Sequence, residues 1–150
     1  MFEATIVWIP IVIAAIAVVF DLRSREIPDS LSIVLVLLAF LQFALPIASP
    51  TWWSHLLGGL LALIAGAVLA HRDGFGGGDV KLFAALGCWF GIGGVFPLAL
   101  WIALAGLPLA VIAAARKQVD FAYAPAILIG VCVHSYAPHL LHQLATWWST

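Results

Sequence analysis

Residues 55–90 read HLLGGLLALIAGAVLAHRDGFGGGDVKLFAALGCWF, and this stretch decides the fold. Its two apolar runs, 55–70 and 80–90, are separated by a short polar turn. Apolar runs bounded in this way predict helices that cross a membrane. The turn ends in Gly76-Gly77-Gly78-Asp79, so a carboxylate stands at the start of the second run. Acids are expensive at such positions, which makes each one a functional candidate.

The whole chain has the composition of an integral membrane protein. It has 150 residues, of which 65% are hydrophobic and 9% charged, and its mean hydropathy is +1.16. A soluble domain of this length has too little interior to bury so much apolar surface. The formal net charge is −1 and the sequence contains no basic stripe, so nucleic acid is not expected as a partner.

The apolar runs predict an all-α polytopic membrane protein, a single membrane-embedded domain over residues 1–150 with six transmembrane helices. The runs are 5–20, 31–47, 55–70, 80–90, 95–115 and 121–145. A spanning helix needs about 20 mostly apolar residues. The fourth run is shorter than this, so the boundary between the fourth and fifth helices is the least defined. The first run is predicted to be retained, because Arg23 and Arg25 follow it and no basic residue precedes it, unlike a signal peptide.

The basic residues predict how these helices are oriented. They fall after the first, third and fifth runs: Arg23, Arg25, Arg72, Lys81, Arg116 and Lys117. By the positive-inside rule these three loops are cytoplasmic, and the N-terminus and C-terminus both face outward. Tryptophans near the predicted outer interface agree with an aromatic belt there. They are Trp8, Trp52, Trp53, Trp147 and Trp148.

Small residues recur at every fourth position of the third run. They are Gly58, Ala62, Gly66 and Ala70. Such a stripe lets helix backbones approach closely in lipid, so we predict packing without chemistry. The stripe serves equally well inside the molecule or between copies, and the oligomeric state therefore stays open.

Asp21 stands where the first run ends. The macrodipole favours cations at a helix C-terminus, so a carboxylate there is misplaced by roughly a few tenths of a kcal/mol. Asp21 is therefore a candidate functional acid, and an ordinary interfacial acid paired with Arg23 or Arg25 is an equally open alternative. Pro28 followed by Asp29 or Ser30 predicts a turn and then an N-cap for the second helix, so Asp29 is predicted to be structural.

Asp79 also has a structural alternative, as an N-cap that satisfies unpaired amides at a helix start. A cap needs one flexible residue before it, whereas four glycines occupy positions 74–78. Their entropic cost is explained if this backbone approaches another closely, for example that of a substrate strand. A phosphate-binding loop is excluded, because the spacing G-x-x-x-x-G-K-[ST] is missing although Lys81 follows.

The predicted topology places Asp21 and Asp79 on the same, cytoplasmic side, each at a helix end. Two carboxylates in contact cannot both ionise cheaply, so we expect them to share one proton. The ionised member of such a pair takes a proton from water while the protonated member polarises a peptide carbonyl. The sequence therefore predicts the division of labour of an aspartic protease.

Three short segments carry a resemblance to a known family. They are Asp21 with Arg23, Arg25, Ile27 and Pro28; Gly76-x-Gly78-Asp79 with Lys81 and Leu82; and Tyr123-Ala124-Pro125-Ala126 ending at Gly130. Together they resemble the prepilin peptidases, which are membrane aspartic proteases of the Gly-x-Gly-Asp type. The resemblance extends from the first predicted helix to the last.

The resemblance implies an intramembrane aspartic endopeptidase of the bacterial cytoplasmic (inner) membrane, with its active site at the cytoplasmic face. Its substrate would be a type IV prepilin or pseudopilin with a short basic leader ahead of a hydrophobic helix, cut typically after glycine. The implied site residues are catalytic Asp21 and Asp79 and substrate-binding Gly76, Gly78, Lys81 and Pro125. For Lys81, tuning of Asp79 and contact with a lipid phosphate are equally open roles.

The chain departs from the larger members of that family, which carry an N-terminal cytoplasmic region with paired CxxC motifs, linked to methylation of the new N-terminus. Its two cysteines, Cys88 and Cys132, lie inside apolar runs and are predicted to be small buried hydrophobes. The chain is most similar to small peptidase-only members found with tight-adherence (Flp-type) pilus systems. This similarity implies proteolysis without methyl transfer, zinc or another cofactor. The five histidines are divided between both predicted faces, as interfacial polar residues are.

Two other classes of function are alternatives. One is a small proton-coupled transporter, but both acids lie at one predicted face and no acid lies at the predicted midplane, where a relay needs polar steps. The other is a non-catalytic subunit of a pilus or secretion assembly that retains the fold. An asparagine at either position would favour that subunit, and both acids are present.

Overall fold

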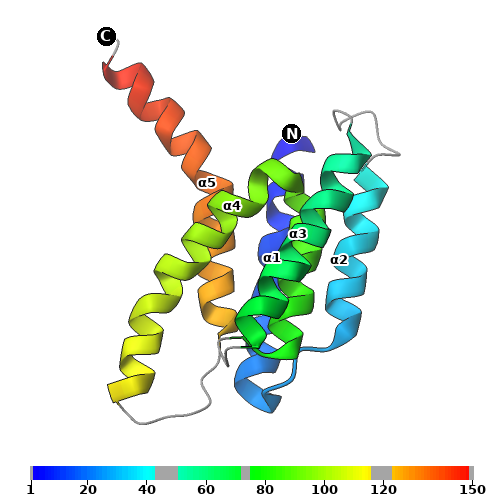
Figure 1. Ribbon diagram of the computed structural model, residues 1–150. Coiled ribbons are helices and arrows are strands. Elements are labelled where there is room, and N and C mark those ends of the chain that lie inside the picture. Colours follow the sequence, from blue (N-terminus) through cyan, green and yellow to red (C-terminus); the bar gives the residue numbers. More distant parts are fainter. Residues whose placement is uncertain (1, 43–50, 72–74, 116–122, 149–150) are drawn as a thin grey trace.

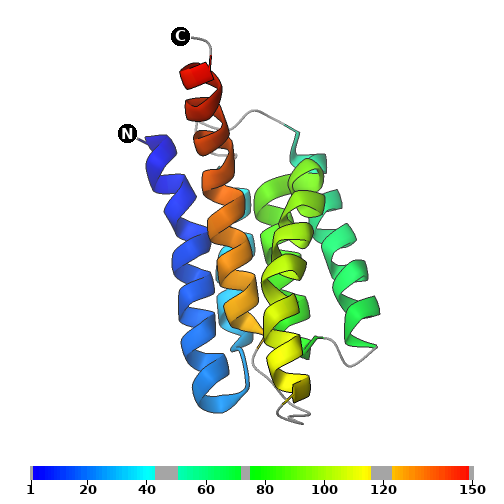
Figure 2. The ribbon, with the colours of Figure 1, turned by 90° about the vertical axis from the view of Figure 1, so that its left-hand side faces the viewer.

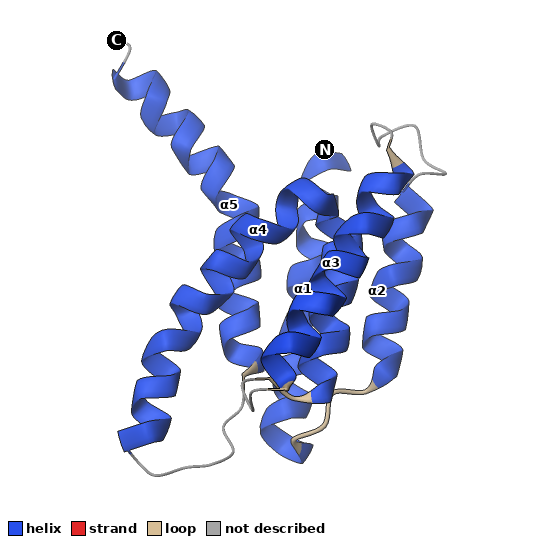
Figure 3. Ribbon diagram, viewed as in Figure 1, coloured by secondary structure: helices blue, strands red, loops and turns tan. Residues whose placement is uncertain are grey.

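The computed structural model describes residues 2–42, 51–71, 75–115 and 123–148, and these residues form five α-helices (Figures 1 and 3). The helices are α1 (Phe2–Ser24), α2 (Asp29–Leu41), α3 (Trp52–Ala70), α4 (Gly77–Ala115) and α5 (Ala124–Trp148). The described part of the chain contains no strand. The predicted all-α class is therefore confirmed.

Helix α4 consists of two helical arms that meet at Gly91. This residue has φ 71° and ψ 176°, a backbone conformation that side chains disfavour and glycine allows. The arms, residues 77–90 and 92–115, correspond to the fourth and fifth predicted helices. Figure 1 shows the chain rising through the green arm and descending through the yellow arm. The backbone N–H of Ile92 donates a hydrogen bond to Ser54 Oγ at 3.2 Å, so a side chain of α3 caps the second arm.

Three of the described helices are long and apolar enough to cross a membrane. The apolar stretches are Val7–Ser24, Trp52–Ala70 and Gly77–Ile112. Helix α2 and residues 124–137 of α5 are apolar but shorter. The end of the predicted second run, at 43–47, lies outside the described residues, as do Arg72, Arg116 and Lys117. The count of six spans and their orientation therefore stay predictions.

Both views of the ribbon place the end of α1 and the starts of α2, α4 and α5 at one end of the bundle (Figures 1 and 2). We call this the lower end, as it is drawn in both figures. The start of α1 and the end of α5 lie at the opposite, upper end. The helix ends that carry the two candidate acids are therefore brought to the same end of the molecule.

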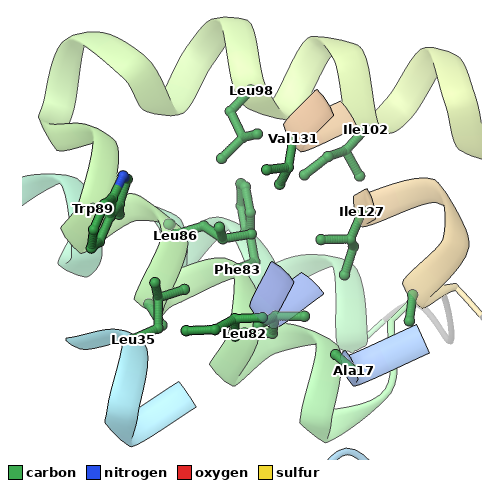
Figure 4. Close-up of a cluster of buried hydrophobic side chains, with 14 of the residues drawn as sticks. Ala17, Leu35, Leu82, Phe83, Leu86, Trp89, Leu98, Ile102, Ile127 and Val131 are labelled. Carbon is green, nitrogen blue, oxygen red and sulfur yellow. The ribbon is translucent and has the colours of Figure 1, made fainter. Parts of the chain in front are cut away.

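The core lies where the first arm of α4 meets α2, α5 and the second arm. Phe83 and Leu86 of the first arm are almost completely buried. In Figure 4 they lie among side chains from the other elements: Leu35 of α2, Leu98 of the second arm, and Ile127 and Val131 of α5. Because lipid is as apolar as these side chains, close packing holds the helices together in a membrane. The first arm of α4 is thus the central element.

The outward faces of the helices carry large apolar side chains. Examples are Phe96, which is 71% exposed, and Leu37 and Val111, which are each 64% exposed. So extensive an apolar surface is unusual for a monomer in water and marks contact with lipid or another protein. The exposed faces agree with the membrane-type composition.

The stripe of small residues on α3 packs against the first arm of α4, as the sequence predicts. A Cβ added to Gly58 would lie 2.5 Å from the carbonyl oxygen of Gly87, and one added to Gly87 would lie 2.5 Å from that of Gly58. Ala62 between them is fully buried. The two backbones are therefore in direct contact, and the predicted packing role is confirmed within one molecule.

Candidate active site

Asp21 and Asp79 lie together at the lower end of the bundle. Asp21 comes from the last turn of α1 and Asp79 from the first turn of α4. Their exposed fractions are 7% and 6%. Asp21 lies near enough to Asp79 for their charges to interact. The structure therefore brings together the two acids that the sequence singles out, which we call the acid pair.

Asp21 is held by the start of α5. The backbone N–H of Ala124, the first residue of α5, donates a hydrogen bond to Asp21 Oδ2 at 3.1 Å. This amide belongs to the first helical turn and has no partner inside its own helix. The positive end of the α5 macrodipole also favours a carboxylate here. Asp21 lies at the unfavourable end of its own helix dipole, as predicted, but the start of α5 compensates for this cost.

Asp79 uses only one of its two oxygens for capping. The backbone N–H of Gly76 donates a hydrogen bond to Asp79 Oδ2 at 3.1 Å. Asp79 is the third residue of α4, and its side chain binds the amide of Gly76, the residue before the helix. This hydrogen bond is one half of a capping box. The other oxygen, Oδ1, is buried and accepts no hydrogen bond from the described residues. Leaving a buried acceptor unpaired costs about 1–3 kcal/mol, so capping alone does not explain this acid.

Gly78 lets the start of α4 approach the link between α1 and α2. A Cβ added to Gly78 would lie 2.9 Å from Ile27 Cβ and 3.3 Å from Ile27 N. A Cβ added to Gly77 would meet nothing within 4 Å, and one added to Gly76 would lie 3.2 Å from Asp79 Oδ2. The glycine run is predicted from the sequence to let this backbone approach another closely, for example that of a substrate strand. In the structure the close neighbour of Gly78 is the chain's own Ile27, and this contact brings Asp79 toward α1.

Lys81 binds an acid outside the pair. Its Nζ lies 2.6 Å and 2.8 Å from the two carboxylate oxygens of Asp29, and both side chains are more than half exposed. The ion pair joins α2 to α4, and such an exposed pair contributes about 0–1 kcal/mol. The predicted N-cap at Asp29 or Ser30 is wrong, because the cap position of α2 is Pro28 and Asp29 is the first helical residue. The substrate-binding role of Lys81 stays a prediction.

Pro125 is the second residue of α5 and is half-buried. Proline has no N–H, which costs nothing in the first turn of a helix, and its fixed φ suits the helical conformation. It directly follows Ala124, whose amide holds Asp21. Pro125 therefore stiffens the backbone that supports the acid pair, and its contact with substrate stays a prediction.

Two aromatic residues near the acid pair, Phe75 and Tyr123, are not among the predicted site residues, although Tyr123 stands in one of the segments that carry the resemblance. The ring centroids of Phe75 and Tyr123 are 4.6 Å apart. Burial, and after it the negative charge of Asp79, raise the pKa of the Tyr123 phenol, so this group stays protonated beside the acid. Each aromatic immediately precedes an amide that binds one of the acids, in Gly76 and Ala124. An aromatic residue before each of these backbone segments is the signal that could have drawn attention to them.

Two of the described histidines, His55 and His134, have partners outside the acid pair. His55 Nδ1 is 2.9 Å from the carbonyl oxygen of Cys88, and the His134 ring meets Phe90 edge-on at 4.6 Å. Within the described ranges, no group of three or more His, Cys, Asp or Glu residues could hold a metal ion. The side chains of His139 and His142 lie outside the described part.

The fold and site together define a helical, membrane-type protein with a buried pair of acids at one end. The family model of the type IV leader peptidases matches residues 8–115, a range that includes both acids. The chain therefore belongs to the type IV leader peptidase family, as the resemblance in its motifs predicts.

A curated relative from Neisseria gonorrhoeae is described as a prepilin leader peptidase/N-methyltransferase. It is 29% identical over 137 residues, and the match covers 87% of this chain and 48% of the relative. The chain thus spans about half the length of that relative. No solved structure matches the chain.

Proposed function

We propose that this chain is an aspartic endopeptidase that removes the leader peptide of prepilins or pseudopilins, with Asp21 and Asp79 as its catalytic pair. The observation that carries the proposal is the buried acid pair, in which Asp79 Oδ1 has no hydrogen-bond partner among the described residues. Membership of the leader peptidase family supports the reaction class and the substrate class. No metal or other cofactor takes part in the proposed reaction.

The chemistry follows from one proton shared by two acids. The ionised acid takes a proton from water as the water oxygen adds to the peptide carbonyl carbon, and the protonated acid gives its proton to the carbonyl oxygen. The first acid then protonates the departing nitrogen as the C–N bond breaks. The second acid recovers its proton from the intermediate. The products are a carboxylic acid and a new N-terminus, and the pair returns to its starting state.

The surroundings of the pair support a single negative charge shared between the acids. The amides of Gly76 and Ala124 each donate to one carboxylate, and both belong to the positive ends of helices, α4 and α5. Repulsion between Asp21 and Asp79 opposes a second negative charge. The protons therefore belong to the pair rather than to either residue.

We propose six spans, with cleavage at the cytoplasmic face of the inner membrane. Arg23, Arg25 and Lys81 are all near the lower end, which the positive-inside rule places in the cytoplasm. The stacked Trp52 and Trp53 begin α3 at the other end, where an interfacial anchor is expected. The six proposed spans are α1, α2, α3, the two arms of α4, and α5. The surrounding medium is the lipid bilayer.

For the substrate we propose an Flp-type prepilin, on the basis of the motif resemblance to small peptidases of tight-adherence systems. We further propose cleavage without methyl transfer by these 150 residues, although the relative is described as having both activities. The resemblance to peptidase-only members supports this part. Incubation with radiolabelled S-adenosylmethionine and cleaved prepilin tests it, and label in the mature pilin would contradict it.

The proposed function is tested by co-expression with an Flp-type prepilin and detection of the shorter product on a gel. The wild type is compared with Asp21→Asn, Asp79→Asn and the control Asp29→Asn, an exposed acid outside the pair at the same end of the bundle. We expect cleavage by the wild type and the control, and loss of about 100-fold or more in each pair variant, because a positioned acid or base contributes about 10²–10⁴-fold. Equal cleavage by all four proteins would exclude the acid pair as the catalyst.

A further inference from the structure

An apolar cavity of about 270 Å³ opens between α3, the two arms of α4, Phe75 and Tyr123. Its lining includes Ala65, Leu69, Phe75, Ala99, Ala103 and Tyr123. None of its described lining residues is charged. An apolar cavity of about 150 Å³ already binds benzene. This larger cavity therefore has room for an aromatic or large aliphatic side chain.

The cavity begins one residue from each amide that holds the acid pair. Phe75 precedes Gly76, whose N–H binds Asp79, and Tyr123 precedes Ala124, whose N–H binds Asp21. Successive Cα atoms are only about 3.8 Å apart. Since the rings of Phe75 and Tyr123 contact each other and both line the cavity, they form its wall next to the acids.

We propose that this cavity is the subsite for the first large apolar side chain on the helix side of the scissile bond. This inference rests on the proposed endopeptidase function. A substrate of that class has a basic leader on one side of the cut and an apolar helix on the other. An uncharged, mainly apolar cavity beside the acids fits the apolar side and disfavours the basic leader.

The wall formed by the second arm of α4 suits an incoming helix. Its lining residues include the small Ala99 and Ala103, and Ala103 is exposed. Small residues on a helix face allow another helix to approach closely in a membrane. The substrate helix therefore lies along this arm while its first large side chain enters the cavity.

The size of the cavity sets which apolar side chain of the substrate is preferred. Substitutions at two exposed positions change that size. Ala103→Leu narrows the cavity, and Leu69→Ala widens it; Leu69 is 45% exposed, so neither change falls in the core. Ala67→Leu is the matched control, because Ala67 is exposed on α3 and does not line the cavity.

The test uses purified enzyme and four membrane-anchored reporters, each with the same basic leader and apolar helix. They differ only in the first residue on the helix side of the cut, which is Ala, Leu, Phe or Trp. We expect the wild type to cleave the Phe reporter about tenfold or more faster, in kcat/KM, than the Ala reporter. Ala103→Leu lowers the Phe-to-Ala ratio by about tenfold, Leu69→Ala raises the Trp-to-Phe ratio, and Ala67→Leu leaves both ratios unchanged.

Equal cleavage of all four reporters by an active wild type would overturn the subsite and leave the proposed function standing. The same conclusion follows if Ala103→Leu and Ala67→Leu give the same ratios, the result expected if lipid rather than substrate fills the cavity. A wild type that cleaves none of the reporters or the prepilin itself would overturn the proposed function and the subsite together.

Discussion

At the scale of single residues, the two oxygens of Asp79 have different surroundings. Oδ2 accepts the hydrogen bond of the Gly76 amide and fixes the start of α4. Oδ1 is buried without a partner among the described residues, and the carboxyl group as a whole lies near enough to Asp21 for their charges to interact. An oxygen left unpaired at this cost is suited to accept a proton from a bound reactant. The structural and the catalytic interpretations of Asp79 are therefore compatible, one for each oxygen.

Gly78 offers a test of how the acids are brought together. Gly78→Ala places a Cβ 2.9 Å from Ile27 Cβ, so the start of α4 must shift away from α1. Overpacking costs about 1–3 kcal/mol unless the backbone shifts to relieve it. Because such a shift moves Asp79 relative to Asp21, we expect cleavage to fall by at least about tenfold. The measurement is kcat/KM of the purified variant.

The control for this change is its neighbour, Gly77→Ala, where an added Cβ meets nothing within 4 Å. Its kcat/KM is expected to stay within about twofold of the wild type, as surface substitutions usually change stability by no more than about 0.5 kcal/mol. Similar losses in the two variants would show that glycine flexibility, rather than the contact with Ile27, controls the site.

At the scale of helices, the reversal at Gly91 determines the shape of α4. Gly91→Ala forces a side chain into φ 71° and puts its Cβ 2.9 Å from Ser54 Oγ. A left-handed conformation costs a non-glycine residue about 1–2 kcal/mol. We expect a lower melting temperature in detergent. Gly93→Ala is the control, because a Cβ there meets nothing within 4 Å; equal melting temperatures of the two variants would contradict this account of the hinge.

The helices also show what the sequence could and could not predict. Apolar runs and helical spacing predict the class, the approximate helices and the packing stripe, because those signals are local. The boundary near Gly91 is hard to predict, since residues 91–94 are apolar or glycine and carry no charge to end a helix. The arms therefore join into one element in α4.

The candidate site was only partly predictable for the same reason. The alternation of helices predicts that Asp21 and Asp79 share one end, and the structure agrees, because the end of α1 and the start of α4 lie at the same end of the bundle. The hydrogen bond from the Ala124 amide to the Asp21 carboxylate, however, joins residues 103 positions apart in the sequence. No local sequence pattern encodes such a contact. The same holds for the ion pair of Lys81 with Asp29, which are 52 positions apart.

At the scale of the whole molecule, the lower end concentrates the acid pair, the helix starts that hold it and the cavity beside it. The orientation of this end in the membrane decides which side of the substrate it meets. Cysteine labelling tests the proposed orientation in a background with Cys88→Ala and Cys132→Ala. Ser24 at the lower end and Thr51 beside the upper end are both exposed positions for single cysteines.

With an impermeant maleimide, we expect Thr51→Cys to react in intact spheroplasts and Ser24→Cys to react only after the membrane is opened. The charge distribution is the physical reason, because Arg23 and Arg25 flank Ser24 and favour the cytoplasm. The reverse labelling pattern would contradict the proposed orientation and the cytoplasmic site of cleavage.

The central claim is that Asp21 and Asp79 act as one catalytic unit. The most direct test is kcat/KM for prepilin cleavage by Asp21→Asn, Asp79→Asn and the double variant, measured with purified protein. Residues that act as a unit give strongly non-additive losses. We predict that the double variant is no slower than the slower single variant. Losses that multiply in the double variant, or substantial activity in either single variant, would contradict the claim.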